Sequence, residues 1–146
     1  MARVTVTMNS TPDDVWAVLA DGWSYATWVV GTVKIRAVDA TFPAVGSRLH
    51  HAVGAWPLMI EDATEVLECE PGRRLLLQAR GWPMGEATVE LVLHVDGTST
   101  QVAMYEEPTS GPGAWVNNPV IDKIGEHRLR EALDRLRRLV EGRVLA

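Results

Sequence analysis

The stretch EATVELVLHVDGTSTQVAMYEE (residues 86–107) decides the fold class of this chain. Apolar and polar residues alternate over 86–95 and again over 99–107, which is the period of a half-buried β-strand. The Asp-Gly pair between these two segments is typical of a turn. A short connection between consecutive strands indicates antiparallel pairing, since parallel strands need a long crossover.

The same two-residue period recurs through most of the chain. Five further segments have it, and the connections between them carry Gly and Pro residues of turns. These predicted strands are residues 3–9, 32–38, 47–53, 57–67 and 73–80. Because the last six strands follow one another with short connections, we predict an antiparallel meander.

Three segments have helical character. Residues 10–21 (STPDDVWAVLAD) begin with capping residues, Pro and two acids, which predicts a short helix ending near Gly22. Residues 22–31 (GWSYATWVVG) contain a second short helix or a tight connection. From Asn118, a candidate cap, an apolar stripe at helical spacing predicts one long C-terminal helix that Gly142 ends.

These elements predict an α+β fold. A curved antiparallel sheet of seven strands carries two short helices, and the long C-terminal helix lies across its concave side. The chain of 146 residues is expected to form a single domain over residues 1–146.

Composition excludes several classes of partner. The net charge of −5 argues against nucleic acid and anionic membranes, which reward clustered Lys and Arg. No run approaches the roughly 18 apolar residues of a membrane span, so we expect no stable membrane insertion and a cytoplasmic protein. One cysteine, Cys69, excludes an intrachain disulfide and a multi-cysteine zinc site. We expect a monomer or a homodimer.

Two of the four histidines stand side by side in LHHAVGAW (49–56). Neighbours in a strand point to opposite faces, so His51 shares the inward face with Leu49, while His50 points outward. They do not form a chelating pair, which would need i, i+2 spacing, and we predict no metal and no cofactor. His51 is a candidate for proton transfer or for binding a ligand carbonyl. A half-buried histidine bonded to a backbone carbonyl is the alternative.

Two carboxylates are further candidates for acid–base chemistry. Val102 and Met104 predict that Glu106 faces inward. Asp62 faces inward only if Ile60 does, and the apolar residues of 57–67 fit either face. A buried carboxylate needs a donor such as His51 or a raised pKa, and either would suit acid–base chemistry; a position at the rim is the alternative.

Four stretches of the sequence carry a resemblance to a known family: STPDDVWAVLADGWSYATWV (10–29), VGSRL (45–49), TEVLECEPGRRLLLQAR (64–80) and EPTSGPG (107–113). With them the sequence resembles the SRPBCC superfamily, the helix-grip fold shared by START lipid-transfer domains, the birch pollen allergen and bacterial polyketide cyclases. The resemblance covers essentially the whole chain. It implies a deep, mostly apolar cavity between the sheet and the long helix.

The six tryptophans of the chain suit such a cavity, because Trp offers a broad flat surface with one hydrogen-bond donor. Four of them fall near the ends of elements, where ordinary packing at loop corners is the alternative. The residues expected to contact a ligand are Tyr25, Trp28, Leu49, Trp56, Ile60, Trp82, Val89, Leu91, Met104, Trp115, Asn117, Ile121 and Gly125. Arg80 is added because cyclases of this superfamily often keep an arginine in the cavity, although its strand position predicts that it points outward.

The resemblance implies a small hydrophobic or aromatic ligand, polyketide-like or lipid-like. One hypothesis is a cofactor-independent polyketide cyclase or aromatase, in which His51, Glu106, Asp62 and Arg80 move protons while the cavity holds the substrate chain. A second is a non-catalytic carrier of a lipid or metabolite. A third is a stress-related, co-chaperone-like interaction module. We rank small-molecule binding first and leave catalysis open.

Overall fold

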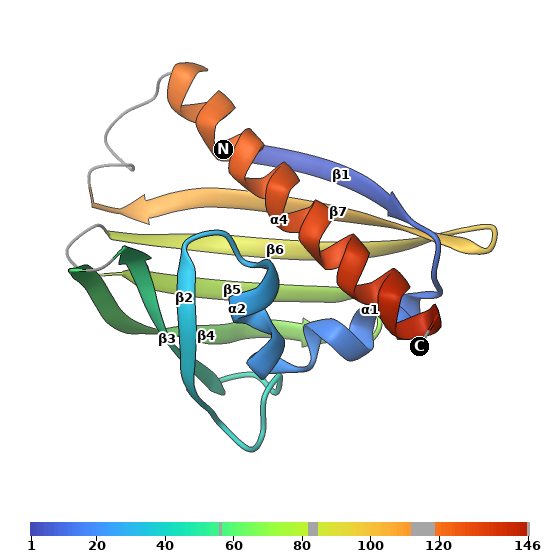
Figure 1. Cartoon of the computed structure of the whole chain (residues 1–146), viewed down its shortest axis with the longest axis horizontal. Helices are drawn as coiled ribbons and strands as arrows, with labels where there is room; N and C mark the ends of the chain where they lie inside the picture. The colour runs from blue at the N-terminus through green and yellow to red at the C-terminus, as the bar shows by residue number, and fades with distance from the viewer. Residues whose placement is uncertain (56, 82–84, 112–118, 146) are drawn as a thin grey trace.

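The computed structural model describes residues 1–55, 57–81, 85–111 and 119–145 (Figure 1). Seven strands form one antiparallel sheet in the order β1-β7-β6-β5-β4-β3-β2. The strands are β1 (Ala2–Met8), β2 (Thr32–Val38), β3 (Arg48–Ala55), β4 (Leu58–Glu70), β5 (Arg74–Gly81), β6 (Gly85–Asp96) and β7 (Ser99–Ser110). The helices are α1 (Pro12–Leu19), α2 (Tyr25–Trp28), which follows the 3-10 turn η1 (Gly22–Ser24), and α4 (Pro119–Leu145).

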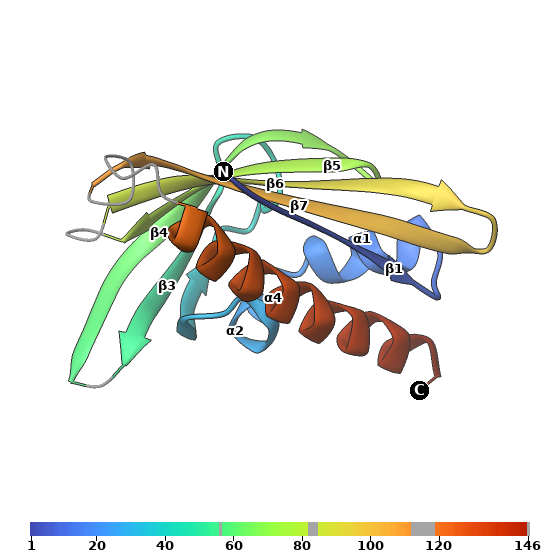
Figure 2. The same cartoon turned by 90° about the horizontal axis from the view of Figure 1, so that it is seen from above.

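This architecture confirms the predicted helix-grip fold. The sheet curves around α4, which lies across its concave side (Figure 2). α4 runs from the end of the sheet where β6 begins and β7 ends toward α1. β1 joins the far end of the meander by pairing with β7. The meander from β2 to β7 follows chain order, as short connections require.

The start of α1 follows directly from its sequence. Thr11 caps the helix: its Oγ1 accepts a hydrogen bond from the backbone N–H of Asp14, and the Asp14 carboxylate accepts one from the N–H of Thr11. This reciprocal capping box satisfies two N–H groups that a helix start leaves without partners.

The end of α4 differs from the prediction. Gly142 does not end the helix, which continues to Leu145. A glycine inside a helix costs roughly 1 kcal/mol relative to alanine. That cost is too small to end a helix whose preceding turns are anchored by the buried side chains of Leu136 and Val140.

The hydrophobic core lies between α4 and the sheet and is closed by α1 and α2. α4 packs on β1, β7, α1 and α2. The inward positions of β6 and β7 near the Asp-Gly turn are filled by large side chains, among them Leu93 and Val102. Val95 has the same inward parity, but it lies in the part of the β6–β7 hairpin that extends beyond the core and is 71% exposed.

Val102 and Val95 provide a matched test of this core. Val102→Ala should lower the free energy of unfolding by about 2 kcal/mol or more, because it removes two methyl groups from a fully buried site and leaves a cavity. Val95→Ala should lower it by less than about 0.5 kcal/mol. Urea unfolding of both variants measures the difference, and equal losses would contradict the burial described here.

Candidate functional site

The concave face of the sheet has a sealed half and an open half. In the sealed half the facing side chains of β5 and β6 are large and buried, whereas in the open half they are small and partly exposed. The sealed pairs are Leu75–Leu91 and Leu77–Val89, and the open pairs are Ala79–Ala87 and Gly81–Gly85. The side chains on this face of β5 and β6 therefore become shorter toward the end of the sheet where β5 ends and β6 begins.

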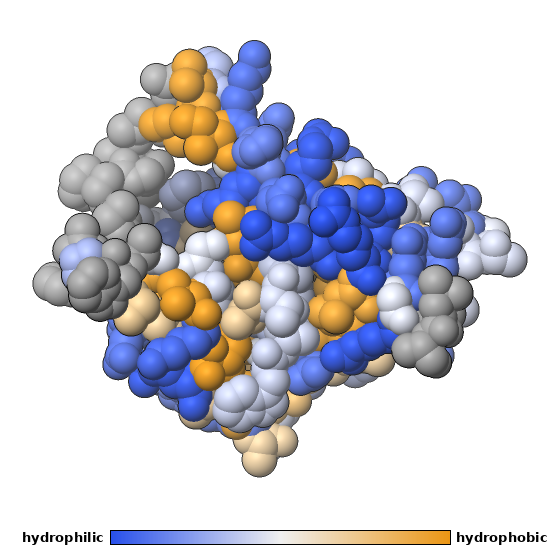
Figure 3. Space-filling model, in the orientation of Figure 1, coloured by the Kyte–Doolittle hydropathy of each residue, from blue (hydrophilic) through white to orange (hydrophobic). Residues whose placement is uncertain are grey.

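Apolar side chains border the open half. On β3 and β4, Val53 and Ile60 face each other and are half-buried, and Val53 reaches toward Gly81 of β5. At the start of α4, Ile121 lies at the edge of the helix side that faces the sheet and is 40% exposed, whereas Ile124, five residues before the buried Leu129, points away from the sheet and is 65% exposed. Figure 3 shows the apolar residues that gather at this end of α4 (orange, upper left). Partly exposed apolar side chains are therefore present on the sheet, at Val53 and Ile60, and on the helix, at Ile121.

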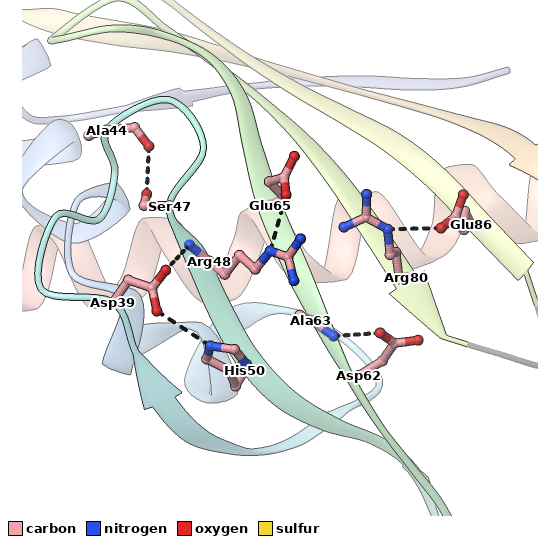
Figure 4. A network of polar contacts seen from close by, with 10 residues as sticks. All are labelled: Asp39, Ala44, Ser47, Arg48, His50, Asp62, Ala63, Glu65, Arg80 and Glu86. Carbon is pink, nitrogen blue, oxygen red and sulfur yellow. Dashed lines mark hydrogen bonds and ion pairs between the residues drawn. The ribbon is translucent and has the colours of Figure 1, made fainter.

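The facing of β4, which the sequence left open, is determined by its register with β3. His51 is paired with Asp62, and Leu49 is paired with Thr64. Paired residues lie on the same face of a sheet, so Asp62 and Thr64 share the concave face with His51. The structure thus brings together two of the predicted acid–base residues, His51 and Asp62. The Oδ1 of Asp62 accepts a hydrogen bond of 2.8 Å from the backbone N–H of Ala63 (Figure 4).

His51 is buried, with 4% of its surface exposed. Its Nε2 shares a hydrogen bond of 3.0 Å with Thr64 Oγ1, while its Nδ1 is buried and has no hydrogen-bond partner among the described residues. Burial lowers the pKa of His51, and the negative charge of Asp62 opposes this shift without cancelling it. The imidazole is therefore neutral at pH 7, and a buried nitrogen without a partner is a place where a polar ligand atom would be stabilised.

Glu106 faces inward, as its strand position predicts. It forms an ion pair with Arg128 of α4, and its side chain is 17% exposed. The donor that compensates this carboxylate is thus Arg128 and not His51. Arg128 escaped the sequence analysis, although the pattern held a signal: it lies three residues after Gly125 and four before Ala132, on the edge of the helix stripe that faces the sheet.

Arg80 lies outside this site. Its side chain is on the convex face of the sheet, where its Nε is 2.9 Å from Glu86 Oε1 (Figure 4). The strand position of Arg80 predicted this outward direction. The expectation, taken from other cyclases, that Arg80 points into a cavity does not hold for this chain. Gly125 also has a packing role, because a Cβ on this residue would lie 3.1 Å from the Cβ of Ala2 on β1.

Tyr25 and Trp28 belong to the packed core. Both are almost fully buried, with ring centroids 4.8 Å apart. The Tyr25 hydroxyl donates to the carbonyl of Leu19 at 2.7 Å, and Trp28 Nε1 donates to Ser24 Oγ at 3.3 Å. Burial raises the pKa of Tyr25 far above its ordinary value. The polar atoms of both residues are therefore engaged within their own segment.

The remaining residues that were predicted to contact a ligand are divided between the sealed half and the open half of the concave face. Leu49, Val89, Leu91 and Met104 are buried, whereas Ile60 and Ile121 are partly exposed in the open half. Trp56, Trp82, Trp115 and Asn117 lie outside the described residues.

Comparison with known proteins identifies the family of this chain. Residues 1–141 match the family model described as "Polyketide cyclase / dehydrase and lipid transport". The chain belongs to this family. No curated protein sequence matches it significantly.

Solved structures of other proteins share the fold of this chain. The Zhui aromatase/cyclase from Streptomyces sp. R1128 superposes with a TM-score of 0.70 at 20% identity, over 98% of this chain and 94% of that one. Protein CV1439 from Chromobacterium violaceum gives 0.70 at 20% identity, over 95% and 96%. DR_A0006 from Deinococcus radiodurans gives 0.67 at 18% identity, over 94% of each chain. At these identities the likeness establishes the fold.

Within the described ranges, no group of three or more His, Cys, Asp or Glu side chains is placed to hold a metal ion. In the same residues, no helix combines the length and the apolar character that crossing a bilayer requires.

The lowered pKa of His51 predicts how stability depends on pH. The unfolded chain takes up a proton at this residue near pH 6.5, whereas the folded protein does so only at lower pH. Stability should therefore fall as the pH drops below about 6.5, and the fall should stop below the folded pKa. His51→Gln should flatten this part of the profile, measured by urea unfolding at a series of pH values.

The control for this experiment is His94→Gln, which replaces an exposed histidine of β6. Its profile should follow that of the parent. If the parent and His51→Gln lose stability equally on acidification, the neutral state assigned to His51 is wrong.

Proposed function

We propose that this protein binds a small hydrophobic or aromatic molecule, polyketide-like in its chemistry, in the open half between the sheet and α4. The observation that carries the proposal is the change from large buried pairs to the pairs Ala79–Ala87 and Gly81–Gly85 along β5 and β6. A floor of small side chains gives a flat molecule room to lie on the sheet. The family, and the likeness to an aromatase/cyclase, support the same class of ligand.

The polar groups around this floor favour a neutral ligand with several oxygen atoms. Glu106 and Arg128 compensate each other's charge on one wall. On the other wall, Asp62 places a negative charge beside the neutral His51, so an anionic group there would be repelled. A phenolic hydroxyl can donate to Nδ1 of His51, and keto oxygens can accept from Arg128. Aromatic polyketides carry both kinds of group.

The same arrangement supports a cyclase activity as the chemical step. A neutral His51 is suited to accept the proton of a methylene group between two carbonyls. The resulting enolate carbon attacks a ketone of the same chain, a carbon–carbon bond forms, and the new alkoxide takes up a proton. Loss of water from this alcohol then gives a double bond. The sequence needs no external oxidant or reductant, and confinement of the chain in the open half supplies proximity.

Binding is tested by filling the open half. Ala79→Phe places a ring above the floor and should weaken binding of emodin, a tricyclic aromatic polyketide, by about tenfold or more. The matched control is Gln78→Phe, the neighbouring residue on the convex face, whose amide donates to Thr109 at 3.2 Å. Isothermal titration calorimetry with emodin and with palmitate measures both variants.

Equal emodin affinity in the two variants would place the ligand elsewhere. Binding of palmitate but not of emodin by the parent would assign a lipid carrier in place of a polyketide-binding protein.

Catalysis is tested with the two adjacent histidines. His51→Gln should slow cyclisation of a poly-β-keto thioester by about 10² to 10⁴, the usual contribution of a general base. His50→Gln removes the neighbour on the convex face, whose Nε2 lies 3.4 Å from Asp39 Oδ1, and should change the rate by no more than about twofold, because His50 has the smallest effect among the charged or titratable groups that act on His51. Product formation is followed by liquid chromatography, with emodin affinity as the check that the site is intact. A His51→Gln rate equal to that of the parent would favour a non-catalytic carrier.

A further inference from the structure

Arg36 contacts the main chain behind both His51 and Asp62. Its Nε donates to the carbonyl of His51 at 3.4 Å, and its Nη2 donates to the carbonyl of Asp62 at 3.4 Å. Its Nη1 lies 3.8 Å from Glu61 Oε2. One guanidinium thus spans two strands and binds the two residues whose side chains face the open half.

A β-bulge brings Arg36 to this place. The register between β2 and β3 shifts between the pair Ile35–His51 and the pair Ala37–His50, which leaves Arg36 as the extra residue of β2. A bulge turns its strand locally and redirects the side chain of the unpaired residue. In a regular ladder, Arg36 would be opposite a residue of β3 rather than free to reach across to β4.

Other arginines of the convex face make a different kind of contact. Arg48 pairs with Glu65 and Arg80 pairs with Glu86, in each case side chain to side chain across neighbouring strands (Figure 4). Such exposed pairs add little to stability. Arg36 instead uses the planar fork of its guanidinium on two backbone carbonyls.

We propose that Arg36 is a positioning residue, which holds His51 and Asp62 opposite each other from the far side of the sheet. The inference rests on the proposed function of the open half. Because a side chain leaves its strand in a direction set by the backbone, fixing the two carbonyls on one face fixes where the imidazole and the carboxylate emerge on the other.

The charge of Arg36 acts in the same sense. It favours the neutral form of His51, as burial does, and so does the adjacent His50, whereas Asp62 favours the charged form. These three groups, Asp62, Arg36 and His50, are the charged or titratable neighbours that act on the imidazole. Removing Arg36 should therefore raise the pKa of His51 as well as loosen its position.

The test compares Arg36→Met, Arg36→Lys and, as the control from the same face, Arg48→Met. Nitrogen-15 NMR reads the pKa and the tautomer of the His51 imidazole without any ligand, and calorimetry reads emodin affinity. Arg36→Met should raise the pKa of His51, mix its tautomers and weaken emodin binding by about tenfold, as expected for loss of a charge-assisted hydrogen bond. Arg36→Lys, which keeps the charge without the fork, should restore the pKa but not the single tautomer. Arg48→Met should match the parent.

Parental pKa, tautomer and affinity in a folded Arg36→Met protein would overturn the proposal. So would equal changes in Arg48→Met, since they would indicate general weakening of the sheet. If Arg36→Met does not fold, Arg36→Lys still decides, because a parental tautomer there would show that the fork has no positioning role. Failure of the parent to bind emodin would count against the proposed function alone, since the two NMR readouts need no ligand.

Discussion

The packing of one amphipathic helix against a curved sheet is the constraint on which the rest of this structure depends. The buried residues of α4 lie between Leu129 and Val140. They pack over the half of the sheet whose inward side chains are large and buried leucines and valines. On the same face, the pairs Ala79–Ala87 and Gly81–Gly85 of β5 and β6 are small, and at the N-terminal end of α4 Ile121 is 40% exposed. The close packing of these leucines and valines fixes the separation between helix and sheet.

The alternation of side chains along a strand was enough to predict which face most of the candidate residues occupy. It placed His51 and Glu106 on the concave face and His50 and Arg80 on the convex face. Gly and Pro residues of turns marked the ends of these strands, and the apolar residues within each strand indicated its inward face. The alternation failed for β4, where apolar residues occur on both faces. Only the pairing of Asp62 with His51 settled that strand, and pairing across strands is not written in the period of either one.

The residues that the sequence did not reveal are those whose role depends on contacts between elements. The helix stripe places Arg128 at the edge of the side that faces the sheet, but its contact with Glu106 also depends on the depth at which α4 packs on β7, which no local pattern encodes. Arg36 reaches Asp62 because a bulge shifts one strand by a residue, and a bulge leaves no clear mark in an alternating sequence. Arg80 is a different case. Its position in the strand predicted that it points outward, whereas the resemblance to other cyclases implied an arginine in the cavity, and the structure agrees with the strand position.

The pairing of β1 with β7 joins the N-terminal strand to a strand about a hundred residues later in the chain. Ala2 is opposite Glu106 in the ladder, and the same Ala2 lies beneath Gly125 of α4. The wall that holds the Glu106–Arg128 pair therefore exists only after the first residues of the chain have met segments more than a hundred residues later. During synthesis, the β2–β6 meander can form before the ribosome has released α4, whereas the ion pair between Glu106 and Arg128 must wait for nearly the whole chain. The wall that contains Glu106 and Arg128 is therefore assembled later than the concave face formed by β3 to β6.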